Sequence, residues 1–164
     1  MARFSLISVL GALVLLPTTL AHMQMVDPSP FRDPHSNRSD EQKDYNVLMP
    51  LHADGSDFAC KGYQWNTPWN SVATYEAGDT YDMTLQGSAT HGGGSNQFSF
   101  SCDGGMQFKV VKGIMGSCPL QKQYSFTVPA EFAKLGKTTC LFAWTWFNKI
   151  GNKEMYMSCA VVED

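Results

Sequence analysis

From Val72 onward, the chain consists of short runs in which apolar and polar residues alternate with a period of two, as in strands with one buried face. Such runs predict strands at 81–85, 97–101, 108–111, 124–128, 140–146 and 153–162. Asp103-Gly104-Gly105 is a hairpin turn between two of them, and only Ala130–Leu135 indicates a helical turn. Many short antiparallel strands joined by Gly and Asp turns favour an all-β sandwich.

Residues 22–59 contain few strand-like runs and many structure breakers, such as Asp27-Pro28-Ser29-Pro30, Asp33-Pro34 and Asp54-Gly55. We therefore expect a long N-terminal loop region, and long ordered loops in compact domains usually have a function. Asn37-Arg38-Ser39 in this region is a sequon for N-glycosylation, which suits an exposed position.

Residues 1–21 have the pattern of a signal peptide: a basic Arg3, an apolar stretch, and small residues at the minus-three and minus-one positions of Thr19-Leu20-Ala21. We expect a secreted, extracellular chain that begins at His22 and forms one domain over residues 22–164. Apart from Arg3 it has 11 Lys and Arg against 15 Asp and Glu, a net charge of −4. This balance, with no basic cluster, argues against a nucleic-acid partner, and no second apolar run predicts a membrane span.

An N-terminal His22 would offer two nitrogen ligands on one residue, its α-amine and its imidazole Nδ1. Their ordinary pKa values, about 7.7 and about 6.5, allow a metal ion to displace both protons near neutral pH. A second histidine would complete three nitrogens in a plane, the arrangement that Cu(II) prefers. The alternative is that cleavage merely happens to fall before a histidine.

Of the other histidines, His91 has the most suggestive surroundings, because Gly92-Gly93-Gly94 follows it at the end of a predicted strand. The sheet would hold the ligand while the glycines let the backbone pass close by. The alternative is a polar turn histidine with glycines needed only for positive φ. Together with His22, we favour a second copper ligand. We expect His35 and His52 to be solvated.

In the last predicted strand, alternation places Glu154, Tyr156 and Ser158 on one face and Met155, Met157 and Cys159 on the other, toward the core. Tyr156 could lie on the axis of a bound copper ion with Glu154 beside it. The alternative is an ordinary packed tyrosine with a hydrated hydroxyl.

Other apolar residues are expected mainly to pack. Met23 and Met25 alternate with His22 and Gln24, and we expect them in the core rather than on copper. Trp144 and Trp146 are predicted core residues. Three aromatic residues of a loop-like stretch could stack on sugar rings or plug an end of the sandwich: Tyr63, Trp65 and Trp69.

Cysteines occur at positions 60, 102, 118, 140 and 159. In a secreted chain most should be oxidised, but an odd number leaves at least one free or paired between molecules. Their spacing includes no CxxC, which argues against a structural zinc site.

Three features together resemble the fungal lytic polysaccharide monooxygenases of auxiliary activity family 11: the N-terminal histidine after the leader, the segment from Ala89 to Gly94, and the long segment from Ala143 to Cys159. The resemblance implies an immunoglobulin-like or fibronectin-like β-sandwich with one copper ion per chain, held by His22 and His91. It assigns Tyr156 as the axial tyrosine, Ala89 as the small residue on the opposite axial side, and Glu154 as a carboxylate near the metal. It further implies oxidative cleavage of chitin, an external electron donor, and oxygen or hydrogen peroxide as co-substrate; we expect a monomer.

The chain departs from that family at Asn96, where the family pattern has a cysteine that would pair with Cys118. Cys102 lies six residues further along the same predicted strand, up to about 20 Å away, and cannot replace it without a change of register. We expect a Cys60–Cys159 disulfide and leave the pairing of Cys102, Cys118 and Cys140 open. A lost disulfide could cost about 2–5 kcal/mol of stability.

Three functions remain in competition. A copper-dependent monooxygenase acting on chitin leads, because the Glu154 and Tyr156 pair favours an enzyme. A secreted copper-binding protein could use the same two histidines for metal uptake without cleaving anything. A carbohydrate-binding domain would bind polysaccharide whether or not a chelator is present.

Overall fold

The computed structural model describes residues 22–136 and 138–163, so the expected signal peptide lies outside the described residues. The described chain forms eight strands and two 3-10 helices. In chain order they are β1 (Met23–Asp27), η1 (Cys60–Trp65), β2 (Ala73–Thr74), β3 (Thr80–Gly87), β4 (Gly94–Ser101), β5 (Lys109–Met115), β6 (Gln123–Thr127), η2 (Ala130–Leu135), β7 (Thr139–Asn148) and β8 (Met155–Glu163). None of the helices described is long and apolar enough to cross a membrane.

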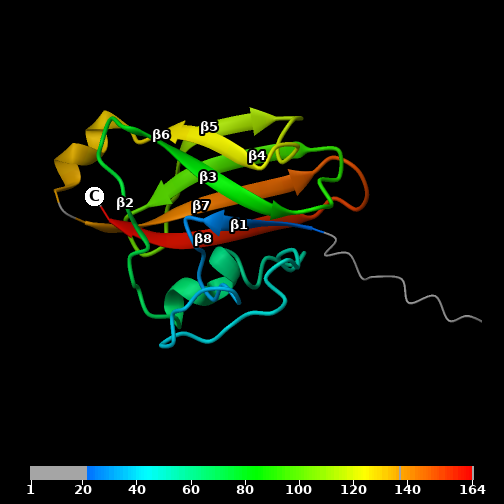
Figure 1. Cartoon of the computed structure of the whole chain (residues 1–164), viewed down its shortest axis with the longest axis horizontal. Coiled ribbons are helices and arrows are strands. Elements are labelled where there is room, and N and C mark those ends of the chain that lie inside the picture. The colour runs from blue at the N-terminus through cyan, green and yellow to red at the C-terminus, as the bar shows by residue number, and fades with distance from the viewer. Residues whose placement is uncertain (1–21, 137, 164) are drawn as a thin grey trace, which may run out of the picture.

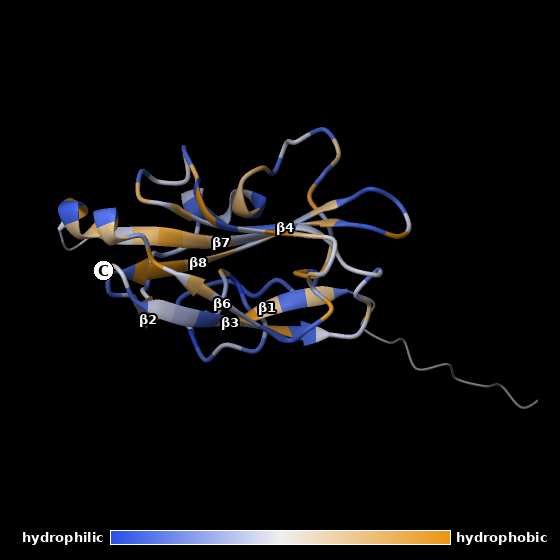
Figure 2. Ribbon diagram, turned by 90° about the horizontal axis from the view of Figure 1, so that it is seen from above, coloured by the Kyte–Doolittle hydropathy of each residue, from blue (hydrophilic) through white to orange (hydrophobic). Residues whose placement is uncertain are grey.

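The strands form two sheets that face each other, which confirms the all-β sandwich (Figure 1). One sheet has the order β1-β3-β6, and the other has the order β2-β8-β7-β4-β5. All pairings are antiparallel except that of the short β2 with β8. Figure 2 separates β1, β3 and β6 from β4, β7 and β8 and shows apolar strand segments in both layers.

The space between the sheets is the main core. Met25 and Met83 from the small sheet meet Phe98 and Trp144 from the large sheet, all with 0% exposure. Met23 and Trp146 are also buried there, so the prediction that both methionines and both tryptophans pack in the core is confirmed.

The predicted strands lie largely within β3 to β8, and Ala130–Leu135 is η2 as expected. The prediction of loop throughout residues 22–59 was wrong at its start, because Met23–Asp27 is β1 and pairs with β3 from Met23 opposite Gly87 onward. Five residues give little periodicity by themselves, and the prolines that follow concealed a strand stabilised mainly by its neighbour. The short helix η1 was not predicted either; positive φ values at Lys61 and Gly62 interrupt it.

The loop region covers the outer face of β7 and β8 and forms a second apolar cluster. Phe31 and Leu51 from the loops pack with Leu141 from β7 and with Met157 and Val161 from β8. Both faces of β8 are therefore buried. The alternation predicted there was correct, but the expectation that the methionine face points to the main core was wrong. Met157 and Cys159 lie in the outer cluster, whereas Tyr156 on the other face lies in the core between the sheets, with 3% exposure.

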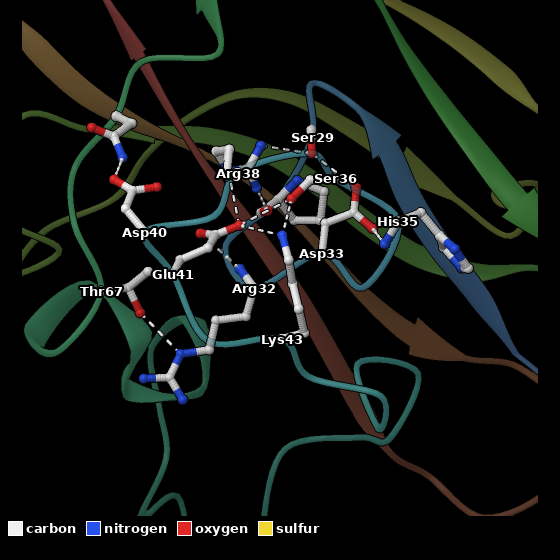
Figure 3. Close-up of polar contacts among 12 residues, drawn as sticks. Ser29, Arg32, Asp33, His35, Ser36, Arg38, Asp40, Glu41, Lys43 and Thr67 are labelled. Carbon is white, nitrogen blue, oxygen red and sulfur yellow. Dashed lines mark hydrogen bonds and ion pairs between the residues drawn. The ribbon is translucent and has the colours of Figure 1, made fainter.

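Polar side chains hold the start of this loop region in place (Figure 3). The Glu41 carboxylate, 3% exposed, accepts hydrogen bonds from Arg38 Nε at 2.8 Å and Ser36 Oγ at 3.2 Å. Asp33 accepts from Ser29 Oγ at 2.9 Å and from Gln24 of β1 at 3.4 Å. Because both carboxylates are used in hydrogen bonds and ion pairs within the loop and with β1, we infer that the network stabilises the loop beside β1.

Four cysteines form two disulfides, Cys60–Cys159 and Cys102–Cys140, and Cys118 is free and buried. The expected Cys60–Cys159 bond is confirmed. Asn96, at the position of the family's cysteine, bonds to the backbone beside the Cys118 side chain: its Nδ2 donates to the Cys118 carbonyl at 2.7 Å, and its Oδ1 accepts from Trp144 Nε1 at 2.7 Å.

Candidate metal centre

Three segments far apart in the sequence meet at one end of the sandwich (Figure 1). They are the start of β1, the loop from β3 to β4, and the beginning of β8 with the turn before it. Register fixes this meeting, because Met23 lies opposite Gly87 at the end of β3, and Trp146 of β7 lies opposite Tyr156. His22, His91 and Tyr156 are carried by these three segments.

The rings of these residues form one cluster. The His22 ring centroid lies 5.3 Å from that of His91 and 5.3 Å from that of Tyr156. Trp146 closes the group, with ring centroids 5.7 Å from His91 and 4.8 Å from Tyr156. The structure thus brings together the two histidines and the tyrosine singled out in the sequence.

The backbone at His91 has an unusual shape that the neighbouring glycines make possible. His91 has a φ of 47°, in the left-handed region. A Cβ at Gly92 would lie 2.6 Å from Ile150 Cδ1, and one at Gly94 would lie 2.0 Å from the Phe147 carbonyl oxygen. The His91 carbonyl accepts a hydrogen bond from Ile150 N at 3.0 Å. Both reasons weighed for these glycines, positive φ and close approach, therefore apply.

The histidine nitrogens suit a metal ion. His91 Nε2 is buried and has no hydrogen-bond partner among the described residues. Burial, followed by the charge of His91, lowers the pKa of His22, while Glu154 acts in the opposite direction. Neutral imidazoles with an unused lone pair are the form that binds transition metals.

A complete ligand set requires more than these side chains. Within residues 22–136 and 138–163, no group of three or more His, Cys, Asp or Glu side chains is arranged to hold a metal ion. His22 and His91 would supply two donors, and the third expected donor is the α-amine that cleavage before His22 would create. The donor set of two imidazoles and one amine fits copper.

Glu154 and Tyr156 form a hydrogen-bonded pair beside the histidines. The Tyr156 hydroxyl donates to Glu154 Oε2 at 2.6 Å. Burial raises the pKa of Tyr156, and the hydrogen bond to Glu154 raises it further, so the phenol keeps its proton. Ala89 lies in the same loop two residues before His91 and is half-buried; its place opposite Tyr156 stays a prediction.

The remaining histidines are exposed, which confirms that expectation for His35 and His52. Of the three loop aromatics, Tyr63 is fixed under Arg32, with Arg32 Cζ 4.3 Å from its ring centroid, and Trp69 donates to the Gln64 carbonyl at 3.0 Å. Only Trp65 is left largely open, with 62% exposure.

Sequence reasoning missed two residues at this end of the sandwich. Trp146 was assigned to the core alone, although it also lies against His91 and Tyr156. Asn148 drew no attention, yet its side chain bonds to the turn that contacts His91. The position of Trp146 could have been found from the pairing of β7 with β8, whereas nothing in the sequence indicated the contacts of Asn148.

Comparison with known proteins identifies relatives of the chain. It is 52% identical over 143 residues to AA11 family lytic polysaccharide monooxygenase A of Aspergillus fumigatus. It is 38% identical over 162 residues to monooxygenase B of the same family and species, and 36% identical over 157 residues to an AA11 family lytic polysaccharide monooxygenase of Aspergillus oryzae. The chain is a homologue of the AA11 family lytic polysaccharide monooxygenases. The family resemblance expected from the sequence is thereby confirmed.

The similarity extends over most of this chain but over less of its AA11 relatives. It covers 87%, 87% and 85% of the chain, and 64%, 35% and 34% of the three relatives in the same order. No protein-family model matches the chain.

Proposed function

We propose that the chain is a secreted, copper-dependent lytic polysaccharide monooxygenase that acts on chitin or chito-oligosaccharides. The observation that carries the proposal is the meeting of His22 and His91, 5.3 Å apart between ring centroids, with His91 Nε2 buried and unpartnered among the described residues. Homology to enzymes named as polysaccharide monooxygenases supports the activity. Chitin as substrate is the expectation that the family resemblance brings.

In this proposal His22 and His91 hold one copper ion, together with the α-amine of His22. A bound copper ion supplies one-electron redox chemistry with oxygen or hydrogen peroxide, and an external donor provides the electrons. The chain's own residues keep the ligands in place: the sheet fixes His22, and the bond from Ile150 N to the His91 carbonyl fixes the loop. Tyr156 keeps a proton directed at Glu154, and that carboxylate lies close enough to influence the charge of His22.

The decisive experiment uses protein whose first residue is verified as His22. Chitin, cellulose and soluble chito-oligomers are incubated with it, copper and ascorbate, and the products are analysed by mass spectrometry. We expect oxidised oligosaccharides from chitin or chito-oligomers that disappear with a chelator or without the reductant. A His91→Ala variant and a variant with one extra residue before His22 should both lose copper binding and product formation.

Other outcomes would overturn the proposal in distinct ways. Full activity with an extra N-terminal residue would show that the α-amine is not a ligand. Tight copper binding without oxidised products from any of the polysaccharides would favour a copper-binding protein. Polysaccharide binding that is unchanged by a chelator, without oxidation, would favour a carbohydrate-binding domain.

A further inference from the structure

Asn148, the last residue of β7, has a polar side chain that is almost completely buried, with 3% exposure. It lies where β7 turns toward β8, between the loop that carries His91 and the strand that carries Tyr156. Burying an amide costs free energy unless its hydrogen bonds are made, and the large majority of buried amides make them. The partners of this side chain therefore indicate what it holds.

One arm of the Asn148 amide leads to the His91 loop. Nδ2 donates to the carbonyl of Ile150 at 3.0 Å, and Ile150 N in turn donates to the carbonyl of His91 at 3.0 Å. The turn at Gly151 lies against both side chains, because a Cβ there would be in ordinary van der Waals contact, at 3.7 Å, with Asn148 Nδ2 and with His91 Nδ1. The position of the His91 backbone therefore depends on the shape of a turn that Asn148 braces.

The oxygen of the same amide binds the segment that carries the Glu154–Tyr156 pair. Oδ1 of Asn148 accepts a hydrogen bond from the backbone N–H of Glu154 at 2.9 Å. The Glu154 side chain accepts from the Tyr156 hydroxyl at 2.6 Å. One planar amide thus donates toward one half of the candidate metal centre and accepts from the other half.

We propose that Asn148 is a positioning residue that sets His91 against the Glu154–Tyr156 pair. The part of this inference that concerns copper binding rests on the proposed function. Asparagine suits the position because it combines a donor and an acceptor in one rigid plane, and only the observed orientation pairs a donor with an acceptor at both ends. Aspartate would keep the acceptor for Glu154 N–H but would set an oxygen against the Ile150 carbonyl, and alanine would remove both bonds.

The first test uses copper-free protein and therefore does not depend on metal chemistry. NMR signals of the His91 and Tyr156 rings are compared among the parent, Asn148→Ala, Asn148→Asp and the control Asn152→Ala. Asn152 is exposed in the same turn. We expect both rings to shift in Asn148→Ala, His91 alone to shift in Asn148→Asp, and neither to shift in the control. If Asn148→Ala does not fold, Asn148→Asp alone decides the matter.

The second test titrates the same variants with Cu²⁺ alone and records the electron paramagnetic resonance spectrum. Loss of residues that orient metal ligands typically weakens binding about 10–100-fold, so we expect at least a tenfold weaker affinity and an altered spectrum for Asn148→Ala. Unmoved ring signals in the Asn148 variants, or a lower melting temperature with unchanged copper affinity and spectrum, would overturn the positioning role. If the parent does not bind Cu²⁺, the proposed function fails, and the ring signals of the copper-free protein still decide the role of Asn148.

Discussion

Tyr156 belongs both to the core and to the candidate metal centre, and its two parts can be separated. The ring is buried and packs against Trp146, while the hydroxyl bonds to Glu154. Tyr156→Phe keeps the ring, so we expect the sandwich to fold and the histidines to bind Cu²⁺. If Tyr156 is the axial residue that the family resemblance assigns, loss of its phenol oxygen should change the spectrum of the bound copper and slow the oxidation of polysaccharide. Titration, spectroscopy and product analysis would measure these effects.

An unchanged copper spectrum in Tyr156→Phe would remove this residue from the surroundings of the metal. Trp146→Phe is a useful comparison, because it alters the ring packed beside Tyr156 without touching the hydroxyl. Its effect on the spectrum should be smaller than that of Tyr156→Phe.

Cys118 links burial to stability at alkaline pH. Burial raises the pKa of its thiol from 9.0 to about 11. Above pH 9 the unfolded chain releases this proton while the folded chain retains it, so stability is fully present below pH 9 and falls as the pH rises toward 11. We expect Cys118→Ala to lack this loss, and urea unfolding of parent and variant from pH 7 to pH 11 would measure it.

The comparison between Cys118→Ala and the parent matters because tyrosines also titrate in this range. The pKa of Tyr124, for example, is raised to about 12, first by burial and then in part by Cys118 itself. The part due to burial is shared by both proteins, whereas the part due to Cys118 belongs to the difference between them. The difference in the free energy of unfolding between the parent and Cys118→Ala should be constant below pH 9. Between pH 9 and pH 11 the parent should lose stability relative to the variant. A constant difference over the whole range would contradict the assignment to Cys118.

At the scale of elements, β3 positions the start of β1 through one glycine. Gly87 has a φ of 125°, and a Cβ there would lie 2.0 Å from the His22 carbonyl oxygen. Gly87→Ala must therefore push His22 away from β3 or strain both strands. We expect a loss of stability above the roughly 1–2 kcal/mol of the backbone conformation alone, and weaker Cu²⁺ binding, measured by thermal unfolding and metal titration.

Gly104→Ala is the matched control for this substitution. Gly104 also has a positive φ, of 82°, but a Cβ there would meet no atom of the described residues within 4 Å. It should lose only the conformational part of the stability and keep its Cu²⁺ affinity. Equal effects of the two substitutions would show that the approach of His22 to β3 plays no part.

The elements that the sequence predicts best are those whose periodicity reflects burial. Strands β3 to β8 alternate because one or both faces pack, and their runs were visible. Strand β1 is stabilised by its pairing with β3, and the local sequence of β1 gives no sign of that pairing. The Cys102–Cys140 bond was left open because it joins β7 to the residue that follows β4, and its closure depends on the pairing of β4 with β7.

The residues of the candidate site also fall into two groups, those that the sequence could indicate and those whose contacts depend on the fold. His22, His91 and Tyr156 could be selected from the sequence because their residue types carry chemistry, and the fold brings them together. Asn96 was recognised as a departure from the family pattern, but its two hydrogen bonds depend on the sheet register and on the turn at Cys118. A bond that crosses between strands is fixed by tertiary structure rather than by neighbours in the chain.

At the scale of the whole molecule, β7 and β8 of the large sheet are covered on both faces, and each apolar cluster has its own disulfide. Cys102–Cys140 belongs to the core between the sheets, while Cys60–Cys159 ties the loop region to β8. The bridged residues are 38 and 99 positions apart. Chain entropy alone predicts stabilisation of about 4 and about 5 kcal/mol. The two disulfides should therefore stabilise the folded chain by similar amounts, although they tie different parts of it together.

Removal of each disulfide should therefore have a different local effect. In the double variant Cys60→Ser, Cys159→Ser, we expect residues 28–72, which comprise most of the loop region together with η1, to detach while the two sheets persist. The reason is that Phe31 and Leu51 pack on the outer face of β7 and β8 and not between the sheets. Limited proteolysis should then cut first within residues 28–72. In Cys102→Ser, Cys140→Ser the whole sandwich should lose stability without early cleavage in that region. Peptide mapping of both digests distinguishes these results, and first cuts within the strands of the Cys60→Ser, Cys159→Ser variant would show that the loop layer and the sandwich unfold as one unit.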